Sequence, residues 1–178
     1  MSNVITQVSP CSDKILDVIL SKPTTFMKLV TESNCATETV EKYVLMHLNE
    51  NKIQQKKGKF RILFSPEIKK SELDFYQLML NPTIKAVLLI LLKSKPISQL
   101  ELVSITDKSS PSVSRALKTL LDKKFIQRNY HAPYSTYEII SKSNIISLLE
   151  TTNPTIANNF DQFDICYPKP SIFLSIHD

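Results

Sequence analysis

The hydrophobic positions of this chain form one pattern that occurs twice. From Ile15 to Ile53, apolar residues meet apolar residues 73 positions later without a gap, as in Val44 and Leu117. In each copy, apolar residues at helical spacing predict three helices, and two alternating runs after the third helix predict a β-hairpin. An offset that stays constant over about forty residues indicates a duplicated structural unit.

The order helix, helix, short turn, helix and hairpin is typical of a winged helix-turn-helix module. We therefore predict an α+β fold, mainly α with small β-hairpins, made of two tandem winged helix-turn-helix modules. The predicted organisation is a first module at residues 12–66, a connecting segment at 67–81 with a helix at 72–80, a second module at 82–141, and a C-terminal helix with a packed tail at 142–178.

The predicted hairpin of the first module is strongly basic. Apolar runs on both sides of Lys57-Gly58 predict a tight turn in which Gly58 has a positive φ. Four cations lie at or near its tip: Lys56, Lys57, Lys59 and Arg61. Cations on such a wing are predicted to contact DNA phosphates or the minor groove, and the alternative is an ordinary solvated turn.

The third helix of the first module, at residues 36–51, is a weaker candidate for reading DNA. Its exposed start has Glu38 and Glu41 against Lys42 alone. Carboxylates facing phosphates repel them, although one glutamate can accept from cytosine. We therefore expect the first module to bind DNA through its wing, to bind weakly, or to contact protein.

The equivalent helix of the second module starts at Ser110 and has a serine-rich and cationic outer face. Val113 and Leu117 lie on its predicted buried stripe. The residues left for the outer face are Ser109, Ser110, Ser112, Ser114, Arg115 and Lys118. Short hydroxyls let a helix approach the major groove closely, and an arginine donates to guanine or to a phosphate. We predict DNA contact here, with a solvated polar face as the alternative.

The hairpin that follows, at residues 126–140, places aromatic residues beside cations. The candidates for DNA contact are Arg128, Asn129, Tyr130 and His131. Tyr137 is expected to pack on the strand face instead, and His131 to be a loop residue rather than a metal ligand.

Residues 112–128 read SVSRALKTLLDKKFIQR. This stretch resembles the recognition helix and first wing strand of MarR-type and ArsR-type winged-helix regulators, which typically read S-x-V-S-R-x-L-x-x-L-x-x-x-G-L-I-x-R. The resemblance covers residues 82–141, and more faintly 13–64. It implies a winged-helix fold, duplex DNA binding and transcriptional control, with DNA-facing roles for Ser112, Ser114, Arg115 and Lys118. The chain departs from the pattern at Phe125, where the family has glycine, and at Pro133 in the wing.

Composition and chemistry narrow the classes of function. A formal net charge of +5 and a pI of about 9.0 weakly favour a polyanionic partner. Cys11, Cys35 and Cys166 are odd in number and lack ligand spacing, so we predict free thiols rather than a disulfide or a zinc site. There is no Ser/His/Asp constellation, and a single glycine excludes glycine-rich phosphate loops. We predict no enzyme activity, no catalytic residue, no metal and no cofactor.

The chain is expected to have no membrane partner. Its most apolar run, residues 86–92, is far shorter than the roughly 20 residues that span a bilayer. The N-terminal sequence lacks the features of a signal peptide. The expected location is the cytoplasm, in association with the nucleoid.

Two classes of function remain open. The leading hypothesis is a sequence-specific transcriptional regulator that binds double-stranded DNA as a homodimer. The alternative is a tandem winged-helix module for protein–protein assembly, of the kind found in chromosome segregation, membrane remodelling or polymerase-associated factors; a replication initiator with paired winged helices is a third reading. The apolar tail, with Phe160, Phe163, Tyr167 and Phe173, is expected to pack on the body or on a partner chain.

Overall fold

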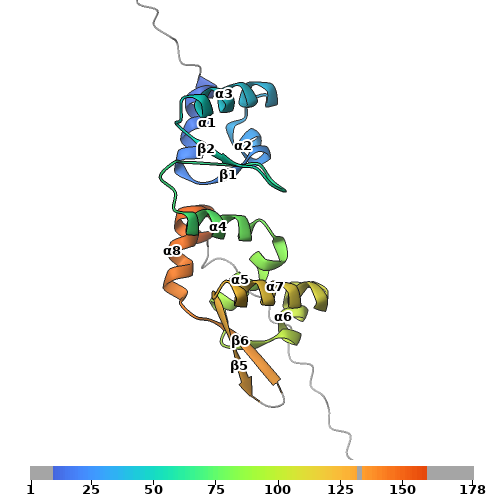
Figure 1. Cartoon of the computed structure of the whole chain (residues 1–178). Coiled ribbons are helices and arrows are strands. Elements are labelled where there is room, and N and C mark those ends of the chain that lie inside the picture. Colours follow the sequence, from blue (N-terminus) through green and yellow to red (C-terminus); the bar gives the residue numbers. More distant parts are fainter. Residues whose placement is uncertain (1–9, 132–133, 160–178) are drawn as a thin grey trace, which may run out of the picture. The chain divides into compact units, whose positions relative to one another are not determined.

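The computed structural model describes residues 10–131 and 134–159, and its contacts divide the chain into two units (Figure 1). The chain passes from unit 1 to unit 2 between Tyr76 and Gln77, and the short stretch Thr151–Asn153 belongs to unit 1. The described residues are mainly helical and include two small antiparallel sheets, each of three strands. The predicted α+β class, mainly α, is confirmed at this level.

Unit 1 contains three helices and one sheet, in which the strands lie in the order β1-β3-β2. Its elements are α1 (Pro10–Ser21), β1 (Thr24–Thr25), α2 (Phe26–Ser33), α3 (Thr37–Asn49), β2 (Gln54–Lys56) and β3 (Ile62–Phe64). The helix α4 (Lys70–Met79) follows and crosses into unit 2.

Unit 2 repeats this order, and its strands lie in the order β4-β6-β5. Its elements are α5 (Pro82–Lys93), β4 (Ile97–Ser98), α6 (Gln99–Thr106), α7 (Ser110–Asp122), β5 (Ile126–His131) and β6 (Tyr134–Ile139). After them come α8 (Lys142–Thr152) and α9 (Pro154–Asn158). The two-residue strands β1 and β4 were not predicted, because two residues are too few to show a period.

The predicted offset of 73 residues reappears in the bounds of the elements. It relates β1 to β4, α2 to α6 and α3 to α7, at both ends of each element. It also relates the residues with positive φ that follow these helices, Asn34 with Asp107 and Asn51 with Lys124. A left-handed residue after α2 or α6 ends the helix and turns the chain toward the next one, and Asn and Asp tolerate that conformation best.

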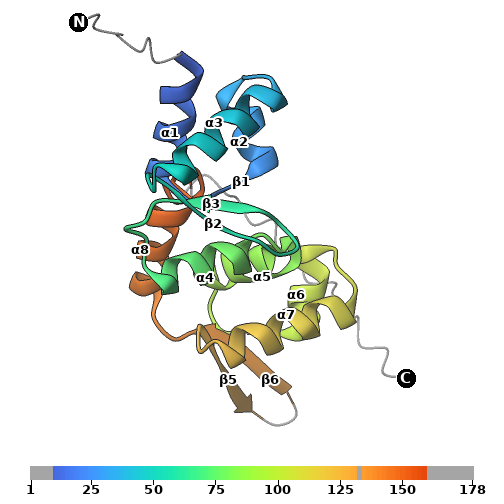
Figure 2. The same cartoon turned by 45° about the horizontal axis from the view of Figure 1, so that its top comes forward.

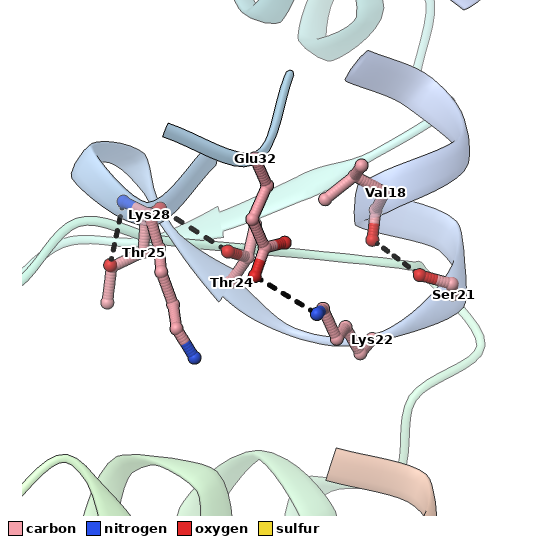
Figure 3. A network of polar contacts seen from close by, with 7 residues as sticks. All are labelled: Val18, Ser21, Lys22, Thr24, Thr25, Lys28 and Glu32. Atoms are coloured by element: carbon pink, nitrogen blue, oxygen red, sulfur yellow. Dashed lines mark hydrogen bonds and ion pairs between the residues drawn. The ribbon is translucent and has the colours of Figure 1, made fainter. Parts of the chain in front are cut away.

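Local hydrogen bonds fix the entry to the helix-turn-helix of unit 1 (Figure 3). Ser21 Oγ donates to the carbonyl of Val18 at 2.8 Å at the end of α1. Thr25 is the N-cap of α2 and accepts from the amide of Lys28 at 3.4 Å. Lys22 Nζ lies 3.1 Å from Glu32 Oε1, which ties the α1–β1 connection to α2.

The core of unit 1 is an aliphatic cluster beneath the three helices and the sheet: Ile15, Ile19, Leu29, Val40, Val44, Ile53 and Leu63. In unit 2, the apolar face of α7 packs against α5 and α6. The expectation that α5 offers an apolar surface to a second chain is wrong, because Val87, Leu88 and Leu91 are buried inside unit 2.

Cys11 and Cys35 form a disulfide, so the prediction that these two cysteines are free thiols is wrong. The bond joins the first turn of α1 to the connection between α2 and α3, across a sequence separation of 24 residues. Spacing along the chain could not reveal it, because the helix order alone brings the two Cβ atoms together. Cys166 lies outside the described residues.

The hairpin of unit 1 differs from the predicted tight turn. Lys56 pairs with Ile62, so residues 57–61 form a longer loop. Gly58 does not have a positive φ. A longer loop spreads the reversal over several residues, and none of them then needs the left-handed conformation that a two-residue turn requires.

Among the described residues, no single helix has the length and hydropathy to cross a membrane. The helices α4 and α5 pass that test only when they are taken together across a bend of 104°.

Candidate nucleic-acid interface

The predicted contact residues of the second module lie together at the start and on the outer face of α7. Ser110, Ser114, Arg115 and Lys118 are exposed, and Ser112 is half-buried. Ser114 and Lys118 lie one turn apart and therefore point in the same direction. Ser109 is the N-cap residue, but its hydroxyl lies 2.8 Å from Ser112 Oγ and caps no backbone amide.

Arg115 also borders a hollow of about 150 Å³ between α7 and the start of α5. The hollow is lined by hydroxyl, apolar and cationic groups: Asn81, Thr83, Ile84, Ser112, Arg115, Ala116 and Thr119. Asn81 Oδ1 accepts from the amides of Thr83 and Ile84 at 3.0 and 3.2 Å, so the first amides of α5 are already bonded. Arg115 is therefore the main group here with which to hold an anion.

The β5–β6 hairpin projects beyond the helices of its unit (Figure 2). Arg128 is exposed, and Tyr130 is 72% exposed. Asn129 is engaged elsewhere, because its Nδ2 donates to Glu138 Oε1 at 2.6 Å. Gln127 donates to the same oxygen at 2.7 Å.

The hydrogen bonds from Asn129 and then Gln127 hold the pKa of Glu138 below its usual value, so this face of the hairpin carries a carboxylate. That carboxylate is a counter-charge close to the predicted contact at Asn129. His131 ends β5, but its side chain is not among those that the structure describes. Tyr137 is buried at 7% exposure, as expected for a residue packing on the sheet face.

The wing of unit 1 has fewer free cations than the sequence predicts. Arg61 Nη1 donates to both carboxylate oxygens of Glu41, at 2.8 and 2.7 Å, and Arg61 Nε donates to Gln55 at 2.9 Å. Its guanidinium also lies 5.2 Å from the centre of the Phe26 ring. Lys56 Nζ lies 3.3 Å from Asp74 Oδ1. Within the described part of the chain, Lys57 and Lys59 are the wing cations outside ion pairs.

The outer face of α3 confirms its acidic character and adds an apolar residue to it. Glu38 and Lys42 are exposed, and Leu45 is 49% exposed. At the offset of 73 residues, Leu45 occupies the place that Lys118 has on α7. Glu41, which corresponds to Ser114, is bound by Arg61. A phosphate backbone would find little to bind on this helix.

The structure also assembles a serine, a histidine and a glutamate that sequence reasoning missed. Ser12 Oγ lies 3.3 Å from His47 Nε2, and His47 Nδ1 lies 3.7 Å from Glu50 Oε2. Ser12 and His47 are 1% and 2% exposed, so a substrate cannot reach the hydroxyl. Because 3.7 Å is too long for a hydrogen bond, the arrangement fixes α1 on α3 and is not a catalytic triad.

Glu50 belongs mainly to another contact. A hydrogen bond from Lys52, with Nζ at 2.9 Å, is the main cause that holds the pKa of Glu50 below its usual value. Nothing in the sequence signalled the Ser12–His47 contact, since the two residues are 35 positions apart. Within the described ranges, no three His, Cys, Asp or Glu residues are grouped so that they could hold a metal ion.

Neither a protein-family model nor a curated protein matches this chain. One solved structure that is similar to it is the DIP2311 protein from Corynebacterium diphtheriae. The two are 10% identical, with a TM-score of 0.32, and the match covers 73% of this chain and 26% of that one. The chain thus corresponds to about a quarter of the neighbour's length, at a similarity too low to support an argument about function.

Proposed function

We propose that this protein is a sequence-specific transcriptional regulator that binds double-stranded DNA through tandem winged helix-turn-helix modules. The observation that carries the proposal is the outer face of α7, where Ser110, Ser114, Arg115 and Lys118 are exposed together. The third helix of such a module enters the major groove. Small hydroxyls allow close approach, while Arg115 and Lys118 supply donors for a base edge or a phosphate.

Unit 1 has a supporting role in this proposal. Its third helix is occupied by the Glu41–Arg61 ion pair, so its contribution to DNA binding comes from Lys57 and Lys59 on the loop of the wing. Exposed lysines hold phosphates without reading sequence. Specificity therefore resides in α7 of unit 2, and unit 1 adds general affinity.

A single chain has one good recognition helix, so reading a palindromic operator requires two chains. We propose a homodimer in the cytoplasm, associated with the nucleoid. Sedimentation equilibrium of the full-length protein and of a chain truncated after Glu150 tests this part. A monomeric mass at micromolar concentration rejects the dimer, and an unchanged dimer after truncation removes residues 151–178 from the contact.

The decisive experiment is selection of bound duplexes from a random-sequence pool, followed by titration of the selected site at several salt concentrations. We expect enrichment of one motif and a log–log fall of affinity with salt, because each phosphate contact releases counterions. Binding that is independent of salt, or a pool that stays random after selection, would contradict the proposal.

A second candidate, a module for protein–protein assembly, is favoured by the exposed apolar side chains of unit 1. Met27, Leu45 and Phe60 are 70%, 49% and 43% exposed. Exposed residues of this size on a face with few free charges are typical of protein contacts. This function becomes the better account if the protein gives no salt-dependent shift with any duplex.

A further inference from the structure

The end of the β5–β6 hairpin carries two large aromatic side chains in solvent. Tyr130 and Tyr134 are 72% and 65% exposed. An aromatic side chain offers 150–250 Å² of surface for burial, so two such rings left in water form an unusually adhesive hairpin end. The role proposed above for α7 does not use either ring.

The strand register places these rings on opposite faces of the hairpin. Tyr130 pairs with Ser135, and His131 pairs with Tyr134. Side chains of directly paired residues lie on the same face, and successive residues alternate between faces. Tyr130 therefore shares the face of Arg128, Tyr137 and Ile139, and Tyr134 lies on the face of Asn129 and Glu138. The last rungs of the hairpin thus present one ring on each side.

The charges near the rings suit a polyanionic chain. Arg128 is exposed two residues before Tyr130 and on its face, so a phosphate can be held beside a base stacked on that ring. On the other face the nearest acidic group in the strand is Glu138, four residues from Tyr134. At about 3.3 Å per residue it is roughly 13 Å away, beyond the screening length at physiological salt.

Unit 1 shows that the tyrosines are not a requirement of the fold. At the offset of 73 residues, Tyr130 corresponds to Lys57 and Tyr134 corresponds to Arg61. The same hairpin position is therefore cationic in one unit and aromatic in the other. A lysine or arginine suits phosphates, whereas an exposed tyrosine ring suits the flat face of a base, which is available only where bases are unpaired.

We propose that the end of the β5–β6 hairpin is a base-stacking site for unpaired nucleobases at the junction between duplex and single-stranded DNA. Tyr130 stacks on a base of one separated strand while Arg128 holds its phosphate, and Tyr134 stacks on a base of the other strand. This inference rests on the proposed DNA binding of unit 2, and it adds a preference for DNA structure to the preference for sequence.

The test compares two DNAs that contain the same selected duplex. One is closed at both ends by hairpin loops held away from the site, and the other ends in a fork of unpaired thymines next to the site. Fluorescence anisotropy at fixed salt should show that the full-length protein binds the fork about tenfold more tightly. A 2-aminopurine at the first unpaired position should be quenched on binding, because stacking quenches its fluorescence.

Three variants separate stacking from other causes. In the double variant Tyr130→Ala, Tyr134→Ala, the preference for the fork and the quenching should both disappear, while affinity for the closed duplex is unchanged. The matched variant Tyr130→Phe, Tyr134→Phe keeps the rings and should keep the preference. Both rings are exposed, so thermal unfolding should be unaffected by either pair of substitutions. Arg115→Ala should weaken binding to both DNAs equally.

Other outcomes overturn one proposal or both. Equal affinity for the two DNAs in the wild type, or a preference that survives the alanine substitutions, rejects the stacking site and leaves the regulator intact. Fork binding that depends on the tyrosines, together with no binding of the closed duplex, supports the stacking site and rejects the regulator. If alanine weakens binding to the closed duplex as much as to the fork, the tyrosines contact paired DNA and the stacking site is rejected. Binding of neither DNA rejects both proposals.

Discussion

Units 1 and 2 share an order of helices and strands but differ in what they present on the helix that follows the turn. On α7 the exposed positions include Ser114, Arg115 and Lys118, and the equivalent positions on α3 are Glu41, Lys42 and Leu45. The buried positions remain apolar in both units, as in Val40 with Val113 and Val44 with Leu117. The difference teaches that burial preserves the scaffold of a duplicated unit, while solvent leaves the outer face free to change.

The two units also stabilise their first helix in different ways. In α5 six apolar side chains are buried: Ile84, Val87, Leu88, Ile90, Leu91 and Leu92. In α1 the buried residues are Ser12, Ile15 and Ile19. A smaller apolar contact stabilises α1 less, since the free energy scales with the buried area. The Cys11–Cys35 disulfide and the Ser12–His47 contact hold α1 in unit 1 instead.

The largest expected effect is therefore the loss of this disulfide. Reduction, or the double variant Cys11→Ser, Cys35→Ser, should lower the free energy of unfolding of unit 1 by about 3 kcal/mol, because a closed loop of this length restricts the unfolded chain. Hydrogen exchange followed by mass spectrometry should show faster exchange in α1 and α3, with α5 and α7 unchanged. The serine variant is the control, since reductant should not affect it further; identical exchange in oxidised and reduced protein contradicts the prediction.

The next largest effect concerns the two equivalent cations, Arg115 on α7 and Lys42 on α3. Arg115→Ala should weaken binding to the selected duplex by about 1–3 kcal/mol if it donates to a base. Lys42→Ala, at the same position of the other unit, should change affinity by less than about 0.5 kcal/mol. Fluorescence anisotropy on the same duplex measures both. Equal losses would mean that the two helices bind DNA alike and that the comparison between the units is wrong.

Alkaline pH should destabilise unit 1 through Tyr76. Burial raises the pKa of Tyr76 to about 12, above the value of 10.0 for an exposed tyrosine. The folded state thus favours the neutral hydroxyl: the stability it contributes is complete below pH 10 and is lost as the pH rises toward 12. Urea unfolding at pH 8 and pH 11.5 should show a loss on the order of 1–2 kcal/mol that Tyr76→Phe lacks. An equal loss in both proteins would assign it to other groups.

The smallest expected effect distinguishes the cations of the first wing. Lys57→Ala with Lys59→Ala should lower affinity for all duplexes alike and reduce the salt slope by about two phosphate contacts. Lys56→Ala is the matched control and should leave the slope unchanged, because its ammonium is paired with Asp74. Glu41→Gln should release Arg61 and raise the slope. If Lys56 matters as much as Lys57 and Lys59, its ion pair with Asp74 does not persist in the complex.

Several features of the fold could be predicted because they depend on local periodicity. The third helix of the first copy, expected at residues 36–51, is Thr37–Asn49, and the connecting helix, expected at 72–80, is Lys70–Met79. Helical spacing of apolar residues and capping residues determine such bounds to within a turn. The positions of Ser110, Ser114, Arg115 and Lys118 on one exposed face follow from the same period.

The candidate site could be predicted less completely, because charge partners depend on distances in space. The sequence placed Lys56 and Arg61 in a basic wing, but it could not show that Asp74 and Glu41 lie within ion-pair distance of them. Likewise, Asn129 was a candidate for DNA contact until the strand register brought Glu138 beside it.

By itself, the sequence determined the duplication, the order of helices and strands and the residues that each helix turns outward, since these depend on periodicity within one segment. The tertiary structure alone decided three further matters: the Cys11–Cys35 disulfide, the neutralisation of Arg61 by Glu41, and the placement of Tyr130 and Tyr134 on opposite faces of one hairpin. Each joins or orients residues from different elements. Their separation is set by how helices and strands pack, and no local pattern of hydrophobic and polar residues records it.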